Sequence, residues 1–101
     1  MNYLILIHQS GEWKGKQVSF AEGTVTIGRG GGNRLIFDEL DHLMVSRQHA
    51  EILWMDNAWV LRDLNSTSGT YRNGVETSQA VLSEGDMVRF GEEGPEIQVR
   101  F

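Results

Sequence analysis

The chain has 101 residues and a net charge of −5, from nine Lys and Arg against fourteen Asp and Glu, and it contains no cysteine. This length predicts a single domain over residues 1–101, because cores below about 50 residues rarely hold together without disulfides or metals. The acidic balance argues against a protein that binds nucleic acid by neutralising its phosphates. Without cysteine, disulfides and thiolate metal sites are excluded.

Membrane insertion and a metal centre are also not expected. The early apolar run, residues 3–7, is too short for a membrane span or a signal peptide, so the cytoplasm is the default location. His8, His42 and His49 stand far apart, and no carboxylate lies at a familiar metal spacing from them. We therefore expect no metal and no cofactor.

Short apolar or alternating runs follow one another along the chain, with turn signals such as Asp56-Asn57 and Asn73-Gly74 between them. Many runs place Val, Ile, Phe or Trp at alternate positions, as a strand with one buried face does, and no ten-residue stretch has a clear helical period. The pattern predicts an all-β sandwich. The predicted strands are residues 2–8, 17–20, 24–28, 34–37, 50–54, 59–63, 70–72, 80–82, 86–90 and 96–101.

Three segments between strands differ in charge from the rest of the chain. Residues 24–37, 43–50 and 64–75 carry +4 and hold no Asp or Glu, which leaves −9 on the remainder of a chain with net charge −5. They are also rich in Ser, Thr and Gly. A phosphate group, with three acceptor oxygens, is best bound by an Arg fork and several short donors. We therefore predict an anion site on loops at one end of the sandwich, with these arginines gathered there: Arg29, Arg34, Arg47 and Arg72.

Four separated motifs lie within residues 28–74. They are Gly28-Arg29 after a strand, the run Ser46-Arg47-Gln48-His49-Ala50, the nine residues 63–71 (DLNSTSGTY), and Asn73-Gly74. In order and spacing they closely resemble the pattern of the forkhead-associated domain family. The resemblance implies a sandwich of two antiparallel or mixed sheets with about eleven strands. It also implies a non-catalytic module that binds phosphothreonine peptides, as a signalling adaptor for partners phosphorylated by a Ser/Thr kinase.

The resemblance assigns phosphate contacts only to matching positions. Arg29 and Ser46 would hold phosphate oxygens, and Arg47 would contribute from the position after the serine. Thr67 would contact the phosphothreonine from the third loop.

Two further positions would contact the peptide. Ser68 stands where the family commonly has an Asn that grips the peptide backbone, and a serine can still donate one hydrogen bond there. Met44 stands where family members often read the third residue after the phosphothreonine, and its thioether, with Asp38, Glu39 and Asp41 nearby, predicts a non-acidic residue. The residues expected to support the loops are Gly28, His49, Gly69, Asn73 and Gly74.

Alternatives from other classes remain. A phospho-independent interaction or assembly domain could keep the fold and use another surface. A hydrolase could use Ser46 as nucleophile, His49 as base and Asp63 as orienter, although the sequence contains no Gly-x-Ser-x-Gly. A nucleotide loop at residues 28–32 is not supported, because no Lys-Ser or Lys-Thr follows it.

Overall fold

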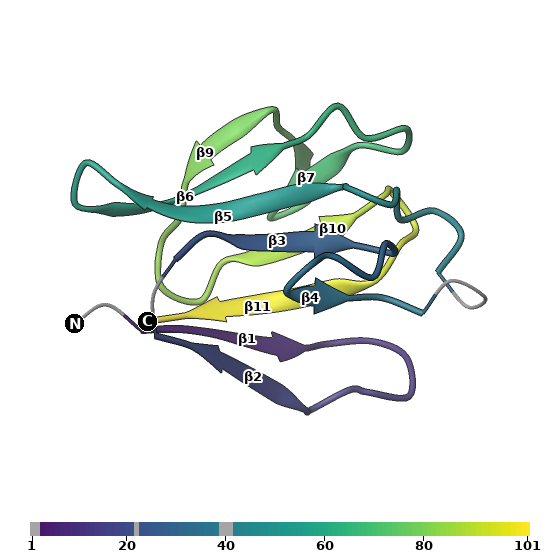
Figure 1. Ribbon diagram of the computed structural model, residues 1–101, viewed down its shortest axis with the longest axis horizontal. Coiled ribbons are helices and arrows are strands. Elements are labelled where there is room, and N and C mark those ends of the chain that lie inside the picture. Colours follow the sequence, from purple (N-terminus) through teal and green to yellow (C-terminus); the bar gives the residue numbers. More distant parts are fainter. Residues whose placement is uncertain (1–2, 22, 39–41) are drawn as a thin grey trace.

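Eleven strands form two sheets around one hydrophobic core in the computed structural model, which describes residues 3–21, 23–38 and 42–101 (Figure 1). Neighbouring strands run antiparallel except for the parallel pair β3–β4. The predicted mixed sandwich is thus confirmed. The first sheet has the order β2(Gln17–Phe20), β1(Leu4–His8), β11(Glu96–Arg100), β10(Met87–Phe90), β7(Thr70–Arg72), β8(Val75–Glu76). The second has the order β4(Leu35–Ile36), β3(Val25–Gly28), β5(Ala50–Met55), β6(Ala58–Asp63), β9(Gln79–Val81).

Two predicted strands, residues 17–20 and 70–72, match the observed ones, and the others differ by one or two residues at one or both ends. The sequence pattern missed β8, because its two residues are both exposed and show no alternation. The predicted start of the first strand at Asn2 lies outside the described residues. Within the described part of the chain, no helix is long and apolar enough to cross a membrane.

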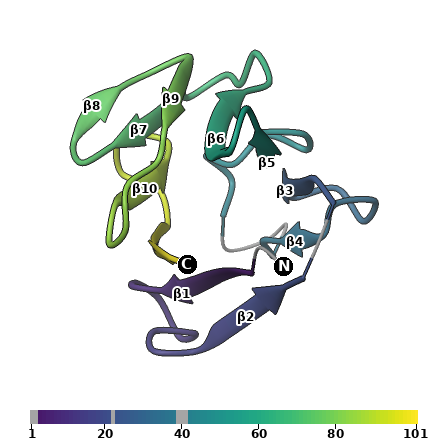
Figure 2. The same cartoon turned by 90° about the vertical axis from the view of Figure 1, so that its left-hand side faces the viewer.

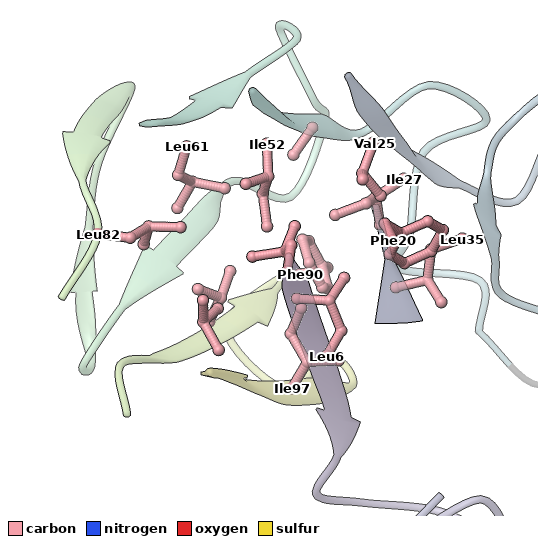
Figure 3. Close-up of a cluster of buried hydrophobic side chains, with 14 of the residues drawn as sticks. Leu6, Phe20, Val25, Ile27, Leu35, Ile52, Leu61, Leu82, Phe90 and Ile97 are labelled. Atoms are coloured by element: carbon pink, nitrogen blue, oxygen red, sulfur yellow. The ribbon is translucent and has the colours of Figure 1, made fainter. Parts of the chain in front are cut away.

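The core is built from the alternate residues that each sheet turns inward. In β1, Leu4 and Leu6 are fully buried, whereas the alternate residues Ile5 and Ile7 are only partly covered. Figure 3 shows Leu6, Phe90 and Ile97 of the first sheet facing side chains of the second. Each fully buried aliphatic or Phe side chain stabilises the fold by about 1.5–3 kcal/mol. This packing fixes the strand ends, and therefore the loops that leave them.

Five loops lie at one end of the sandwich, at the right of Figure 1. They connect β1 to β2, β3 to β4, β6 to β7 and β10 to β11, together with the described part of the connection from β4 to β5, and we call this the loop end. The hairpin turn between β5 and β6 lies at the opposite end. Figure 2, a view from that opposite side, shows how the strands surround the core.

Candidate functional site

The segment that follows β3 lies directly against the segment that precedes β5. The Arg29 backbone N–H donates to the Ser46 carbonyl at 3.0 Å, and the Gly30 N–H donates to the Arg47 carbonyl at 3.0 Å. The Arg29 Nε–H donates to the Val45 carbonyl, which fixes the course of the side chain. The two terminal nitrogens of the guanidinium carry its other four N–H donors. The structure thus brings Arg29, Ser46 and the backbone of Arg47 together.

Gly28 allows this close approach. A Cβ at that position would lie 2.2 Å from the Arg47 carbonyl oxygen and 2.8 Å from the Ser46 carbonyl oxygen. Any side chain would therefore push the two segments apart. The contact is reinforced by Asn33, whose Nδ2 donates to the Gly30 carbonyl at 2.8 Å and to the Arg47 carbonyl at 2.6 Å. Asn33 was not among the residues expected to support the loops. The one feature of the sequence that could have indicated its role is its position directly after a run of glycines.

Ser46 also joins the loop between β6 and β7. Its Oγ accepts a hydrogen bond from the Thr67 backbone N–H at 3.1 Å. A serine hydroxyl has one proton to donate besides the lone pairs that accept. While it accepts from Thr67, Ser46 can therefore donate its proton to an anion at the loop end. This contact places Thr67 beside Ser46 across 21 residues of sequence.

The loop that carries Thr67 and Ser68 is shaped by the carboxylate of Asp63, at the end of β6. Asp63 Oδ2 accepts from the Ser66 backbone N–H at 3.0 Å, and Oδ1 accepts from the hydroxyls of Ser66 at 2.5 Å and Thr70 at 2.6 Å. Burial alone would raise the pKa of Asp63, but these hydrogen bonds outweigh burial and hold the pKa below its usual value. Sequence reasoning considered Asp63 only as the orienter of a triad. An Asp at a strand end with Ser three residues later is a turn signal that could have revealed this role.

His49 is fully buried and links two of the loops. Its Nδ1 lies 3.0 Å from the Ser46 backbone nitrogen, and its Nε2 lies 2.8 Å from the Gly69 carbonyl oxygen. An amide N–H can only donate and a carbonyl can only accept, so the ring proton is on Nε2 and Nδ1 is the acceptor. Burial lowers the pKa of His49, against the smaller raising effects of the Gly69 carbonyl and Asp63. His49 is therefore a neutral side chain that holds the loops together.

This geometry does not form the catalytic triad considered from the sequence. The Nδ1 lone pair, which a general base would need, is occupied by the Ser46 backbone N–H. Asp63 directs its carboxylate to Ser66 and Thr70 instead of orienting the imidazole. The arrangement contradicts the hydrolase alternative, which requires a base within reach of the serine hydroxyl and a carboxylate behind it.

We predict that the free energy of unfolding falls as the pH drops below about 6.5, partly through His49. Its pKa in the folded chain lies below the ordinary value of 6.5, so the unfolded chain binds more protons in that range. The contribution is complete above that value and is lost as the pH falls through the folded pKa. Urea unfolding at about pH 7.5 and about pH 5 checks this. A His49→Gln variant should show a shallower decline, leaving the part due to His8, whose pKa burial also lowers. An equal decline in both proteins would contradict the assignment.

Met44, Ser68 and Gly91 meet beside these loops. A Cβ at Gly91 would lie 3.2 Å from Met44 Cβ and 3.3 Å from Ser68 Cβ, and the Gly91 N–H donates to the Gly69 carbonyl at 2.8 Å. Gly69 and Gly91 both have positive φ, at 85° and 96°, which favours glycine. The structure thus adds the loop between β10 and β11, which sequence reasoning had not linked to the site.

The prediction that four arginines gather at the site is wrong for two of them. Arg72 lies toward the far end of β7, where its Nε is 2.9 Å from Asp86 Oδ2. The Arg34 guanidinium lies over the ring of Phe20, 5.0 Å from its centroid. Arg47 is exposed and lines a hollow with the glycine run of the loop between β3 and β4. The positive charge is therefore more local than the sequence suggested.

Asn73 and Gly74 form the turn between β7 and β8, at the opposite end of β7 from Thr70. Both have positive φ, as such hairpin turns require. Asn73 Nδ2 donates to Asp86 Oδ1 at 3.0 Å, and Asn73 Oδ1 accepts from the Met87 N–H at 2.9 Å. Because they lie at the opposite end of β7, these two residues can support the site only by holding the β7–β8 hairpin in place. The expected acidic neighbours Glu39 and Asp41 lie outside the described residues, while Asp38 is exposed.

Comparison with known proteins gives consistent matches. The family model described as the FHA domain matches residues 25–91. The FHA domain-containing protein FhaA of Mycobacterium tuberculosis is 37% identical over 83 residues, which cover 82% of this chain and 15% of FhaA. The oxoglutarate dehydrogenase inhibitor of Corynebacterium diphtheriae is 33% identical over 87 residues, which cover 86% of this chain and 59% of that protein. The chain thus spans less than two thirds of the length of these curated relatives.

Two solved structures agree over nearly their whole length. One, from a structural and functional analysis of phosphothreonine-dependent FHA domain interactions, has a TM-score of 0.83 and 34% identity, covering 99% of this chain and 97% of that chain. The other is the FhaA FHA domain complexed with the intracellular domain of Rv3910. It has a TM-score of 0.80 and 35% identity, covering 96% of this chain and 99% of that chain.

Proposed function

Because the chain belongs to the FHA (forkhead-associated) domain family, we propose that it binds phosphothreonine peptides and serves as an adaptor for partners phosphorylated by a Ser/Thr kinase. The observation that carries the proposal is the meeting of Arg29, Ser46 and Thr67 at the loop end, joined by hydrogen bonds within the chain. The phosphothreonine-dependent interactions studied for a relative with a TM-score of 0.83 point the same way. Residues 1–101 act as one recognition module, and the interaction takes place in the cytoplasm.

Each contact residue has a distinct task in this proposal. The Arg29 guanidinium donates to two phosphate oxygens, and the Ser46 hydroxyl donates to the third, as suits a group with roughly −1.5 to −2 charge. Arg47 adds positive charge from the neighbouring position. Thr67 contacts the phosphothreonine, and Ser68 donates to the peptide backbone that follows it. The supports Gly28, His49 and Gly69 keep these loops at hydrogen-bonding distance.

Apolar contacts set the preference among peptides in this proposal. Family members hold the threonine methyl in a small apolar pocket, and one buried methyl contributes roughly 0.8 kcal/mol. The methyl would also fix the rotamer that presents the phosphate to Arg29 and Ser46. Met44, about one third exposed at 37%, offers an adaptable thioether to the third residue after the phosphothreonine.

An oriented phosphopeptide library, probed with the isolated chain, tests the proposal. We expect the bound fraction to be enriched in phosphothreonine over phosphoserine, and depleted in aspartate at the third following position. Individual peptides that differ only by Thr or Ser, or only by Asp or Leu at that position, should reproduce both preferences in fluorescence polarisation. A Met44→Arg variant should reverse the second preference, because a guanidinium pairs with a carboxylate.

Other results of the library would separate the alternatives. Binding that is equally strong without phosphate would refute phosphothreonine recognition and support a phospho-independent interaction domain. Equal affinity for phosphothreonine and phosphoserine would refute the methyl pocket alone. Tighter binding of the aspartate peptide would show that Met44 does not read the third position as proposed.

A further inference from the structure

A hollow continues from the candidate site past Met44. It lies between the loop that joins β10 to β11 and the described part of the loop that joins β4 to β5. Its lining runs from Met44 past Leu43, Glu93 and Pro95 to Ser10 and His42. Since Met44 also touches the position of Gly91 beside Ser68, this hollow is continuous with the surface where the peptide would leave the phosphate.

The hollow combines apolar surface with acidic side chains. Leu43 is 75% exposed, although exposure of an apolar leucine side chain to water is unfavourable. A second, smaller hollow shares Ser10, His42 and Pro95 and extends to Trp13, with Glu12 at its edge. Glu12 and Glu93 are both exposed. The described lining of the two hollows thus carries Glu12, Asp38 and Glu93 and no Lys or Arg, although Lys14 and Lys16 follow Glu12 on the β1–β2 loop. Arg29 and Arg47 lie on the phosphate side of Met44.

Hydrogen bonds hold the loop between β10 and β11, which carries Glu93, in a fixed conformation. The Phe90 N–H donates to the Pro95 carbonyl at 3.0 Å, and the Gly94 N–H donates to the Gly91 carbonyl at 3.0 Å. A Cβ at Gly94 would lie 1.8 Å from the Phe90 carbonyl oxygen, so this tight turn requires glycine. Ser10 Oγ accepts from the Glu96 N–H at 3.1 Å and ties the loop between β1 and β2 to the same place. The turn thus presents Glu93 in a defined position.

We propose that this hollow binds a basic segment of the same phosphorylated partner, directly after the third residue beyond the phosphothreonine. The inference rests on the proposed function. Lys and Arg have apolar stems and charged heads, so their stems can cover Leu43 and Met44 while their heads approach Glu12 and Glu93. The site as a whole then recognises a phosphate followed by positive charge.

Three peptides of equal length test the proposal by fluorescence polarisation. All share the phosphothreonine and the three residues on either side of it. The first carries three serines at its start and three lysines at its end, and the second exchanges these two triplets, so the two have the same composition and charge. The third is the first without its phosphate. The three lysines of the first peptide together span about 10 Å when they are extended. We expect the first peptide to bind about threefold to tenfold more tightly than the second, as two exposed ion pairs would give, and the ratio to shrink in high salt.

Matched variants show which residues cause the tighter binding of the first peptide. Glu93→Gln should reduce the ratio about twofold or more, whereas Asp56→Asn, which removes one charge from the β5–β6 turn at the opposite end, should leave it unchanged. Leu43→Ser should weaken the first peptide more than a peptide that ends at the third residue. Equal affinity of the first two peptides, or the same response to Glu93→Gln and Asp56→Asn, would overturn the inference and leave the proposed function intact. Failure of both phosphorylated peptides to bind better than the third would overturn the proposed function, and the inference with it.

Discussion

Replacing Arg29 with alanine is expected to weaken binding of a phosphothreonine peptide about a hundredfold or more while the chain stays folded. Hydrogen bonds that involve charged groups contribute about 1.5–3 kcal/mol each, so loss of a two-point contact to phosphate amounts to at least about 3 kcal/mol. Arg29 lies on a loop at the surface of the sandwich and is not part of the hydrophobic core. Isothermal titration calorimetry measures the affinity, and circular dichroism confirms folding.

Two controls separate recognition from simple charge loss. Arg29→Lys keeps the charge but replaces the planar fork with a point charge, so it should restore only part of the affinity. Arg100→Ala removes one positive charge from the opposite end of the molecule, where Arg100 pairs with the exposed Glu84, and should leave affinity unchanged. Wild-type affinity in Arg29→Ala would refute the assignment of the phosphate site.

Replacing His49 with alanine is expected to destabilise the fold by about 3 kcal/mol. The change removes a fully buried ring and leaves the Ser46 N–H without its partner, and an unsatisfied buried group costs about 1–3 kcal/mol. It also takes one of two donors from the Gly69 carbonyl, which keeps the Gly91 N–H. For a domain of this size, the midpoint of thermal unfolding should fall by roughly 10–20 °C. Peptide affinity, measured at a temperature where the variant is folded, should fall less than in Arg29→Ala.

His49→Gln provides the matched control, because an amide can donate and accept as the imidazole does. It should retain more stability than His49→Ala. An unchanged melting midpoint in His49→Ala would show that the ring does not support the loops. If a serine-directed inhibitor also labelled Ser46 in the unchanged protein, the hydrolase interpretation would revive.

Local sequence pattern was sufficient to predict most of the fold. Strands such as β1 could be predicted because their inward residues alternate with partly covered ones. β8 could not, because Val75 and Glu76 are both exposed and are held by pairing with β7. The motif residues Arg29, Ser46 and Thr67 were predicted together from a family pattern, and the structure places them on adjoining loops.

Residues that act across the sheets were harder to predict. The charge pattern grouped Arg72 with the loop arginines, but β7 carries it away from the loop end to Asp86. Asn33 and Asp63 were missed as supports because their hydrogen bonds depend on how loops fold back on themselves. Glu93 was not singled out from the sequence, and only the position of its loop beside Met44 connects it with the site.

The hydrogen bonds among the loops have a consequence for the entropy of binding. Asn33 and His49 join neighbouring loops, and Asp63 holds the loop between β6 and β7, all through contacts made within the chain. The domain therefore loses little conformational freedom when a peptide docks, and most of the ordering cost falls on the partner, at about 1–2 kcal/mol for each residue whose backbone is fixed. Partners with the same contact residues should then differ in affinity according to the stiffness of their own chains, so that a segment already extended by proline binds more tightly than one rich in glycine.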